Sequence, residues 1–393
     1  MSPDERILVV DGARKPVGGF GGALAQVPAH ELGAVAARTA LGRSGVAPED
    51  TGEVARGCIG QVGPDACNAR RVALAAGLPV TTPAYTVNRL CGSGLQAVWS
   101  AAAHMRWGGP DLVLAGGDES MSRMPFYDFG ARSGYRLGDR TLYDGTVTML
   151  TDPFSGVHMG ITAENVAAKY GVPRAEQDEF AVRSQQRAAS AAARAAFAEE
   201  ITSVEVGGRS PRTVEVDEHP RPGTTLETLA GLLPAFREGG TVTAGNSSGV
   251  NDGAAALVLA RESVAAEREL RPLVALEAVA TAAMEPDLMG YAPVPALRKL
   301  FEQTGAAPCD IGSVELNEAF AAQAVAVIRD ARLDPERVNP YGGAIALGHP
   351  VGATGAILTL RLAKDMVRRN LELGVVTMCI GGGQALAALF RRV

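Results

Sequence analysis

The chain has 393 residues, of which 47% are hydrophobic and 20% charged, and its net charge is −6 at pH 7. That much apolar material predicts a large folded core in two or three structural units and excludes a disordered chain or a single small module. The negative charge and the 5% aromatic content are the opposite of what a general nucleic-acid-binding protein needs.

The cysteines are few, scattered and odd in number: Cys58, Cys67, Cys91, Cys309 and Cys379. This pattern predicts no disulfide framework and favours a reducing compartment. Neither a CxxC nor an HxxxH spacing occurs, so we expect no metal site. The uncharged stretch 373–390 is interrupted by three glycines and the first residues lack the features of a signal peptide. We therefore expect a cytoplasmic protein that does not cross a membrane.

The first third of the chain alternates apolar runs with helix-like periodicity. We expect a strand at 6–11, a helix at 31–43, a helix at 94–105 and a strand at 111–117. Strands that alternate with helices predict a layered α/β fold with a largely parallel sheet.

The last third repeats this alternation. A strand is expected at 314–317, helices at 319–329 and 355–365, and a strand at 374–383. The segment RLCGSGLQAV matches HPVGATGAIL, and LVLAGG matches VVTMCIGGG further along, so two similar halves are predicted. Between them, residues 121–250 have a different composition, with one long helical segment at 174–200 and a polar stretch at 207–225. We interpret this region as an inserted loop domain.

Cys91 lies in a tight glycine turn, Cys-Gly-Ser-Gly, directly before a predicted helix. The amide groups and the dipole at a helix start stabilise an anion, so we expect a lowered thiol pKa and a reactive sulfur. A buried, inert cysteine is the alternative. The same residues match a GxGxxA dinucleotide-binding pattern, but Asp111 precedes its strand instead of ending it, which argues against a nicotinamide cofactor.

Three further residues could serve such a nucleophile. His349 lies at another turn before a helix and, titrating near neutrality, could accept a thiol proton, although a hydrogen-bonded structural histidine is the alternative. Cys379 ends an apolar strand before three glycines whose N–H groups could stabilise an oxyanion; the alternative is an ordinary core cysteine. Asn317 ends another strand, where open α/β sheets place their sites.

Taken together, these segments resemble the thiolase family along essentially the whole chain. The resemblance is carried by NRLCGSGLQAV, NEAFAAQ, GGAIALGHPVGATG and MCIGGGQ, and also by AGGDESMS, HMGITAENVA, DEHPRPGTTLETL, TAGNSSGVNDGAAA and MGYAPVPA, all in the family's order. It implies a five-layered α/β/α/β/α core of two similar halves, with a loop domain over a coenzyme A tunnel. The domains expected are 1–120 plus 251–271, the insert 121–250, and 272–393.

The resemblance also implies roles for individual residues. Cys91 is the nucleophile that carries the acyl group, His349 activates it, and Cys379 is the acid or base at the α-carbon of a second acetyl-CoA. Asn317, through a water, and the His349 ring form one oxyanion site, and the N–H groups of Cys91 and Gly381 form the other. The reaction implied is the condensation of two acetyl-CoA to acetoacetyl-CoA and coenzyme A, or its reverse, with no metal or redox cofactor.

For the substrates, acetyl-CoA and 3-oxoacyl-CoA, the family pattern points to nine binding residues. Arg221 faces the nucleotide end; Ser248 and Ala244 line the pantetheine; the narrow acyl end is lined by Leu150, His158, Met159, Met289, Ala319 and Phe320. A bulky Met159 beside Met289 and Phe320 predicts preference for short chains, whereas Met159 could instead be loop-domain core. The family analogy suggests a homodimer or homotetramer, with neither nucleic acid nor membrane as partner.

The sequence departs from the family pattern at Lys15, along Ile59 to Arg71, and at Ala385. These departures concern substrate preference and a loop expected at the subunit interface, not the reaction class. The nearest alternative is therefore a thiolase that degrades longer 3-oxoacyl-CoAs. An alternative of another class is a non-catalytic, thiolase-like protein that binds acyl-CoA or lipid.

Overall fold

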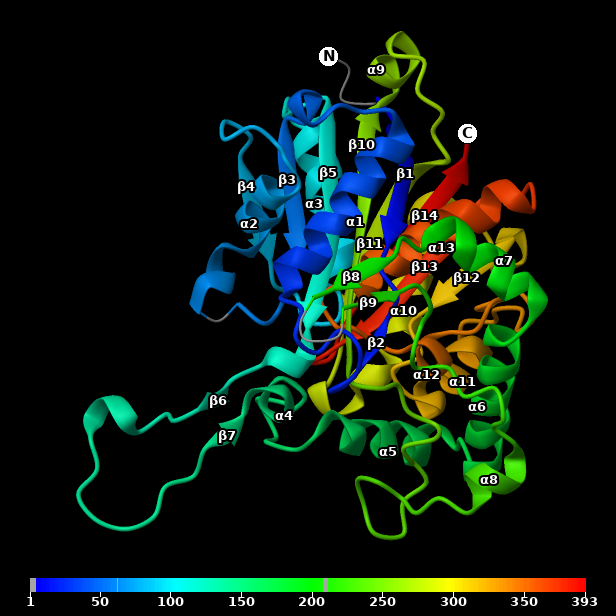
Figure 1. Ribbon diagram of the computed structural model, residues 1–393. Helices are drawn as coiled ribbons and strands as arrows, with labels where there is room; N and C mark the ends of the chain where they lie inside the picture. The colour runs from blue at the N-terminus through cyan, green and yellow to red at the C-terminus, as the bar shows by residue number, and fades with distance from the viewer. Residues whose placement is uncertain (1–4, 62, 208–210) are drawn as a thin grey trace.

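The structure is a computed structural model that describes residues 5–61, 63–207 and 211–393 (Figure 1). Three parts of the predicted regions lie outside the described residues: residues 1–4 of the first half, Val62 in the divergent segment 59–71, and residues 208–210 of the polar stretch. The elements of the amino-terminal half are β1 (Ile7–Arg14), β2 (Gly18–Gly19), α1 (Ala29–Ser44), β3 (Glu53–Gly57), α2 (Asn68–Ala75), β4 (Ala84–Val87), α3 (Ser93–Arg106), β5 (Leu112–Ser120), β10 (Asn251–Arg261) and α9 (Glu262–Glu267).

The carboxy-terminal half has the same succession of strands and helices. Its elements are β11 (Val274–Ala283), α10 (Pro293–Thr304), β12 (Ser313–Leu316), α11 (Ala321–Asp330), α12 (Ala344–Leu347), α13 (Thr354–Arg368), β13 (Leu373–Ile380) and β14 (Gln384–Arg392). The strand order is β12-β13-β14-β11-β1-β10-β5-β3-β4, with β2 beside β10. Outward from the neighbouring strands β11 and β1, the two halves show the same pattern. In β11-β14-β13-β12 and in β1-β10-β5-β3, the first two pairs are antiparallel and the third is parallel. The prediction of two similar halves is thus confirmed.

The expectation of a largely parallel sheet is wrong, because the sheet is mixed. Only β3–β4, β3–β5 and β12–β13 are parallel among the paired strands of the described residues, and the remaining pairs are antiparallel. The physical reason is clearest at β13 and β14, which are joined by the short turn 381–383. A tight turn permits only an antiparallel neighbour, whereas parallel strands need a long crossover.

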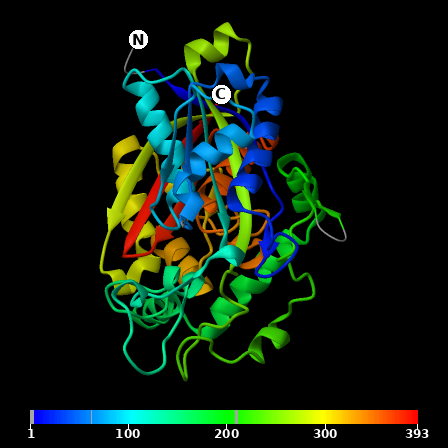
Figure 2. The same cartoon turned by 60° about the vertical axis from the view of Figure 1, so that its left-hand side comes forward.

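Side chains that alternate along the strands divide the core into layers. Ile7 and Val9 of β1 face a central cluster that contains α3 and α13, while Leu8 and Val10 face an outer cluster under α1. In the other half, Leu386, Ala388 and Phe390 of β14 face the same central cluster, and the intervening residues face the helices α10 and α11. In Figure 2 the blue helix α1 and the yellow helix α10 lie on opposite sides of the strands. The predicted five-layered α/β/α/β/α fold is confirmed.

The two central helices touch at their first turns, and glycines permit the contact. A Cβ atom on Gly94 of α3 would lie 2.8 Å from the backbone nitrogen of Ala356, and one on Gly355 of α13 would lie 2.3 Å from that of Leu95. Any larger residue would push the helices apart. The starts of α3 and α13, with the turns that precede them, are therefore held side by side.

The segment between the halves contains β6 (Phe126–Tyr127), β7 (Tyr143–Asp144), α4 (Gly145–Met149), α5 (Met159–Tyr170), α6 (Arg174–Ala188), α7 (Ala191–Glu200), β8 (Val204–Val206), β9 (Arg212–Val214) and α8 (Leu226–Ala230). The single long helix predicted at 174–200 is wrong, because Ser190 caps a new helix by accepting a hydrogen bond from the Ala193 amide. Residues 123–145, which carry β6 and β7, form an arm that extends away from the rest of the molecule (Figure 1).

None of the helices within the described ranges is long and apolar enough to cross a membrane. Within those same ranges, no three His, Cys, Asp or Glu side chains are grouped so that they could hold a metal ion.

Candidate active site

Cys91 lies at the end of a sharp turn that leads into α3. Leu90, just before it, has a φ of +46°, a left-handed conformation that is costly for a leucine. The Ser93 hydroxyl holds the turn, because it accepts from the Arg89 amide at 2.8 Å and donates to the Leu90 carbonyl at 2.7 Å. Gly92 is required by packing, since a Cβ atom there would lie 2.5 Å from Ile380. The turn presents the Cys91 thiol at the edge of the central layer.

The pKa of Cys91 differs from the sequence-based expectation. Burial of the thiol outweighs its place at the helix start and raises the pKa to about 11, although hydrogen bonds from the N–H groups of Gly381 and of Cys91 itself act in the opposite direction. The expected lowering of this pKa is therefore wrong. The thiol needs a base to remove its proton.

His349 is held at three atoms. Its backbone N–H donates to Asn251 Oδ1 at 2.9 Å, its Nδ1 lies 2.6 Å from Thr354 Oγ1, and its Nε2 lies 3.4 Å from Asn317 Nδ2. Burial lowers the pKa of the ring to about 4. The expectation of titration near neutrality is wrong, and for a physical reason: a buried imidazole without a carboxylate partner resists charging. At pH 7 His349 is neutral and able to accept a proton.

Cys379 is fully buried at the end of β13, directly opposite Ala385 in the β13–β14 hairpin. Burial first, and the neighbouring Cys91 second, raise its pKa far above the ordinary thiol value. Once deprotonated, such a sulfur is a strong base. Ala385, where the sequence departs from the family pattern, therefore lies next to a candidate catalytic residue.

Asn317 follows β12 and is fully buried. Its Nδ2 faces His349, whereas its Oδ1 has no hydrogen-bond partner among the described residues. An unpaired buried acceptor is costly unless water or a ligand completes it. This agrees with the water that the family resemblance implies at this position.

The predicted acyl-end residues are partly brought together. Met159, Met289, Ala319 and Phe320 share one apolar cluster with Cys379. Leu150 and His158 lie next to Met159. His158 precedes it in the chain, and the Leu150 carbonyl accepts from the Met159 amide at 2.9 Å. The His158 ring stacks on Phe236 and its Nδ1 caps α5, so this side chain already has structural partners.

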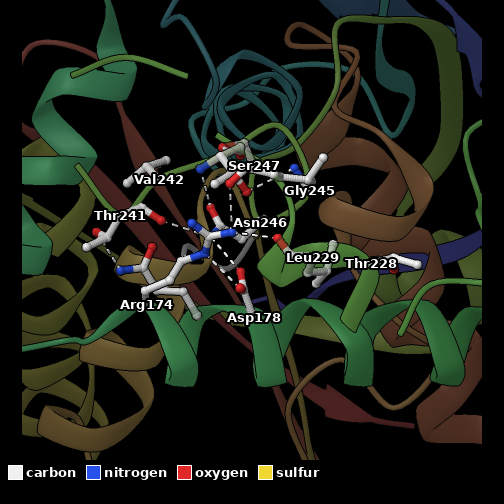
Figure 3. A network of polar contacts seen from close by, with 12 residues as sticks. Arg174, Asp178, Thr228, Leu229, Thr241, Val242, Gly245, Asn246 and Ser247 are labelled. Carbon is white, nitrogen blue, oxygen red and sulfur yellow. Dashed lines mark hydrogen bonds and ion pairs between the residues drawn. The ribbon is translucent and has the colours of Figure 1, made fainter. Parts of the chain in front are cut away.

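The two predicted pantetheine residues lie on a segment that a polar network holds (Figure 3). Asn246 donates to Asp178 of α6 at 2.9 Å, and Arg174 of the same helix donates to Asp178 and to the Leu229 carbonyl. The neighbouring Ser248 amide donates to the Ala319 carbonyl at 3.0 Å. This network fixes Ser248 beside the acyl-end cluster and leaves Ala244 exposed.

Arg221 lies apart from the catalytic cluster, on an anchored loop. Asp217 pairs with the buried Arg14, Glu218 accepts from the Gly19 and Ala23 amides, and the Arg221 amide donates to Gln185. The carboxylates of Asp217 and Glu218, which lie near Arg221 in the chain, are thus already hydrogen-bonded to other groups of the protein. The Arg221 side chain is exposed and forms no ion pair within the described part of the chain.

Comparison with known proteins agrees with this arrangement over nearly the full chain. The thiolase N-terminal domain matches residues 7–263 and the thiolase C-terminal domain matches residues 270–392. The chain belongs to the thiolase family.

Relatives of this thiolase match it from end to end. An acetyl-CoA acetyltransferase of Cupriavidus necator is 45% identical over 98% of this chain and 99% of that protein. The acetyl-CoA acetyltransferase of Bacillus anthracis has a similar structure, with a TM-score of 0.97 and 41% identity over 99% of both chains. The human mitochondrial 3-ketoacyl-CoA thiolase in complex with CoA gives a TM-score of 0.96 and 40% identity over 99% of this chain and 98% of the other.

Sequence reasoning on single residues missed the groups that hold this thiolase's catalytic side chains. Asn251 and Thr354 contact His349, and Ser93 holds the Cys91 turn. The buried Glu119 accepts from the amides of Ile59, Gly60 and Gly352, and burial raises its pKa to about 7. It thereby joins the turn after His349 to the loop after β3. All four residues fall inside motifs of the resemblance. The contacts of Ser93 and Thr354 are local in sequence, whereas those of Asn251 and Glu119 are made to residues far along the chain.

Proposed function

We propose that this thiolase is an acetyl-CoA C-acetyltransferase, which joins two acetyl-CoA into acetoacetyl-CoA and coenzyme A and catalyses the reverse thiolysis. The proposal rests on one observation: a buried centre combines a thiol at a helix start, a neutral histidine and a second thiol whose thiolate form is a strong base. The names of the relatives support the same activity.

In the first half-reaction, Cys91 Sγ attacks the acetyl carbonyl carbon while its proton passes to His349. The N–H groups of Gly381 and Cys91, which already point at this sulfur, are placed to stabilise the carbonyl oxygen as it becomes negative. The bond from the acetyl carbon to the coenzyme A sulfur then breaks, and His349 returns the proton to the departing sulfur. Acetyl-Cys91 and free coenzyme A result.

In the second half-reaction, His349 takes the Cys379 proton, and the Cys379 thiolate then removes one α-proton from the next acetyl-CoA. The resulting carbanion attacks the carbonyl carbon of acetyl-Cys91, the bond from that carbon to Cys91 breaks, and His349 gives its proton to the Cys91 sulfur. Both sulfurs end as they began, and one carbon–carbon bond has formed. The chemistry uses coenzyme A thioesters alone and requires no metal or redox cofactor.

The test is a thiolysis assay with acetoacetyl-CoA and coenzyme A, combined with intact-mass analysis after exposure to acetyl-CoA. We expect turnover and a single acetyl group on Cys91. Binding of acetyl-CoA without turnover or label would instead support the non-catalytic, acyl-CoA-binding alternative.

Substrate length is the second part of the proposal, and the apolar cluster supports short chains. Met159, Met289 and Phe320 surround the acyl end beside Cys379. We expect kcat/KM to fall from four-carbon to six-carbon 3-oxoacyl-CoA and to be nearly lost at ten carbons. Each methylene changes selectivity by only ~1–3 kcal/mol, so the decline should be graded. Equal thiolysis of the ten-carbon substrate would favour the degradative alternative.

Met159→Ala sharpens the chain-length test. If Met159 closes the acyl end, this variant gains activity on longer chains relative to the four-carbon substrate. If Met159 is only core, the variant loses stability and keeps the wild-type profile. Phe197→Ala is the control, because Phe197 is also buried but belongs to a different apolar cluster, which does not contain Cys379.

We also propose that coenzyme A lies along Arg221, Ser248 and Ala244, with Arg221 at the nucleotide phosphates. The exposed, unpaired guanidinium supports this role. Arg221→Gln should raise the KM for coenzyme A while leaving kcat nearly unchanged, and an unchanged KM would contradict the assignment.

The proposed assembly is a homodimer or homotetramer in the cytoplasm. The arm 123–145 supports self-association, because Phe126, Phe129, Leu137 and Leu142 are each at least 60% exposed. The strand β4 adds an uncovered sheet edge. Each of the five cysteines, all within the described residues, is unpaired, which suits a reducing compartment. Light scattering of the intact chain and of an arm-shortened variant tests the assembly.

A further inference from the structure

The Nδ1 side of His349 is occupied by a single hydroxyl group. Thr354 Oγ1 lies 2.6 Å from His349 Nδ1 and also 2.9 Å from the Pro350 carbonyl oxygen, four residues earlier. Thr354 is 3% exposed and His349 5% exposed, so bulk water does not compete for these contacts. The chemistry of these three atoms restricts where the protons can be.

A hydroxyl group carries one hydrogen, and a carbonyl oxygen can only accept. If the Thr354 hydrogen points to Pro350, then Oγ1 must accept, and the donor is His349 Nδ1–H. On the other side of the ring, the Asn317 amide nitrogen, which can only donate, faces Nε2 at 3.4 Å. A donor in that place needs an unprotonated Nε2. Both neighbours therefore favour the same tautomer.

We propose that Thr354 is a positioning residue that keeps His349 in the tautomer protonated on Nδ1, so that Nε2 carries no hydrogen and its lone pair can exchange the long 3.4 Å contact with Asn317 Nδ2 for the Cys91 proton. This rests on the proposed function. When the proton moves from Cys91 Sγ to Nε2, the ring becomes an imidazolium, and Thr354 Oγ1 continues to accept from Nδ1–H. With the other tautomer, Nε2 would already carry a proton and could not act as the base.

The experiment compares Thr354→Val, which removes the hydroxyl and keeps the shape, with Thr359→Val. Thr359 is also buried in α13 and donates to the carbonyl four residues earlier, Gly355, at 2.7 Å, but it has no hydrogen bond to His349 in the described structure. The control therefore loses the same kind of helix bond. Thr354→Ser restores the hydroxyl.

Two readouts are needed. The first is the ¹⁵N NMR spectrum of histidine-labelled protein, with the His349 signals assigned by their loss in His349→Asn, which reports the tautomer without any turnover. The second is the rate at which acetyl-CoA acetylates Cys91, followed by rapid quench and mass analysis.

We expect wild type and Thr359→Val to show Nδ1–H on His349. Thr354→Val should shift the population toward Nε2–H and slow acetylation by about 10- to 100-fold, part of the ~10²–10⁴-fold that a general base contributes. Thr354→Ser should recover both. An Nε2–H tautomer in the wild type, or a Thr354→Val variant with unchanged tautomer and rate, overturns the proposal.

The outcomes separate this proposal from the proposed function. If acetyl-CoA leaves no label on wild-type Cys91, the proposed function fails, whereas the NMR spectrum still reports the tautomer. If Thr354→Val does not fold, Thr354→Ala is used, and the wild-type spectrum alone is still decisive against the proposal when it shows Nε2–H.

Discussion

The turns that open α3 and α13 hold matching places in the two halves, yet they carry different chemistry. The turn before α3 presents Cys91, whereas the matching place before α13 is occupied by Val351, a core residue, and His349 lies just before it. Because the two helix starts touch through Gly94 and Gly355, the turn that carries a nucleophile in one half lies beside the turn that carries a base in the other. The two halves thus place matching turns side by side, and the first carries the nucleophile while the second carries the base.

The strands that follow these helices differ in the same way. At the end of β5, Asp118 is paired with the buried Arg56, and Glu119 accepts three backbone amides. At the end of β13, Cys379 lies among apolar side chains. The polar groups of β5 form hydrogen bonds within the fold, while the Cys379 thiol of β13 has no side-chain hydrogen-bond partner among the described residues and is available for chemistry.

The largest loss of activity is expected when the nucleophile is removed. We expect Cys91→Ala to lose both the acetyl label and thiolysis to the detection limit, because no other group can carry the acyl chain. Intact-mass and peptide analysis after exposure to acetyl-CoA provides the measurement. A label that maps to Cys379 in the wild type would reverse the roles of the two cysteines.

The second cysteine should affect only the later step. Cys379→Ala should still acquire the acetyl label from acetyl-CoA but lose condensation and exchange of the acetyl methyl protons by ~10²-fold or more. Mass analysis and proton NMR in deuterated buffer measure the two properties in one sample. Retained methyl-proton exchange would show that another group removes the α-proton.

The contact between the helices can be loosened without touching the catalytic residues. Gly94→Ala places a methyl group against the α13 backbone and should lower the free energy of unfolding by ~1–3 kcal/mol. Gly42→Ala in α1 is the matched control, because a Cβ atom there meets nothing within 4 Å; it should raise stability by ~0.5–1 kcal/mol. Urea unfolding compares them, and equal effects would contradict the close packing.

Much of this architecture could be predicted from the sequence, because local patterns carry it. Apolar runs and glycine turns located β5, β13, α3 and α13 to within a few residues. The sense of strand pairing was missed, since β1 pairs with β10 and β11, which lie more than 240 residues away. Long-range contacts of this kind leave no periodic signal.

The candidate site was predictable as a set of residues, but its electrostatics were not. The sequence shows that Cys91 precedes a helix, which favours a low pKa, but not how deeply the thiol is buried, which decides the outcome. Asp217, which lies near Arg221 in the chain, gave the same difficulty, because its partner Arg14 lies 203 residues earlier. Burial and partners of this kind depend on the whole fold.

A pH-dependent effect is expected at the ends of two matching strands. β11 ends in alanines that are partly or fully exposed, whereas β1 runs on into Arg14 and Lys15, which the inserted segment covers completely. Arg14 has carboxylate partners, but among the described residues the Lys15 ammonium group donates only to the Ser203 carbonyl. Burial, reinforced by the nearby Arg38, lowers the pKa of Lys15 to about 7. The buried amine is therefore a cost to the folded state whenever it is charged.

The sign of the pH dependence follows from this lowered pKa. Between pH 7 and the ordinary lysine value of about 10.5, the unfolded chain binds more protons at Lys15 than the folded chain, so this residue makes stability rise with pH in that window. Below pH 7 both states are charged and the penalty is constant. We expect Lys15→Met to be more stable than wild type at pH 7. The difference should shrink by on the order of 1 kcal/mol per pH unit above pH 7. Urea unfolding at pH 7, 8 and 9 tests this, and a difference independent of pH would mean that Lys15 is neutral throughout or that its amine is solvated.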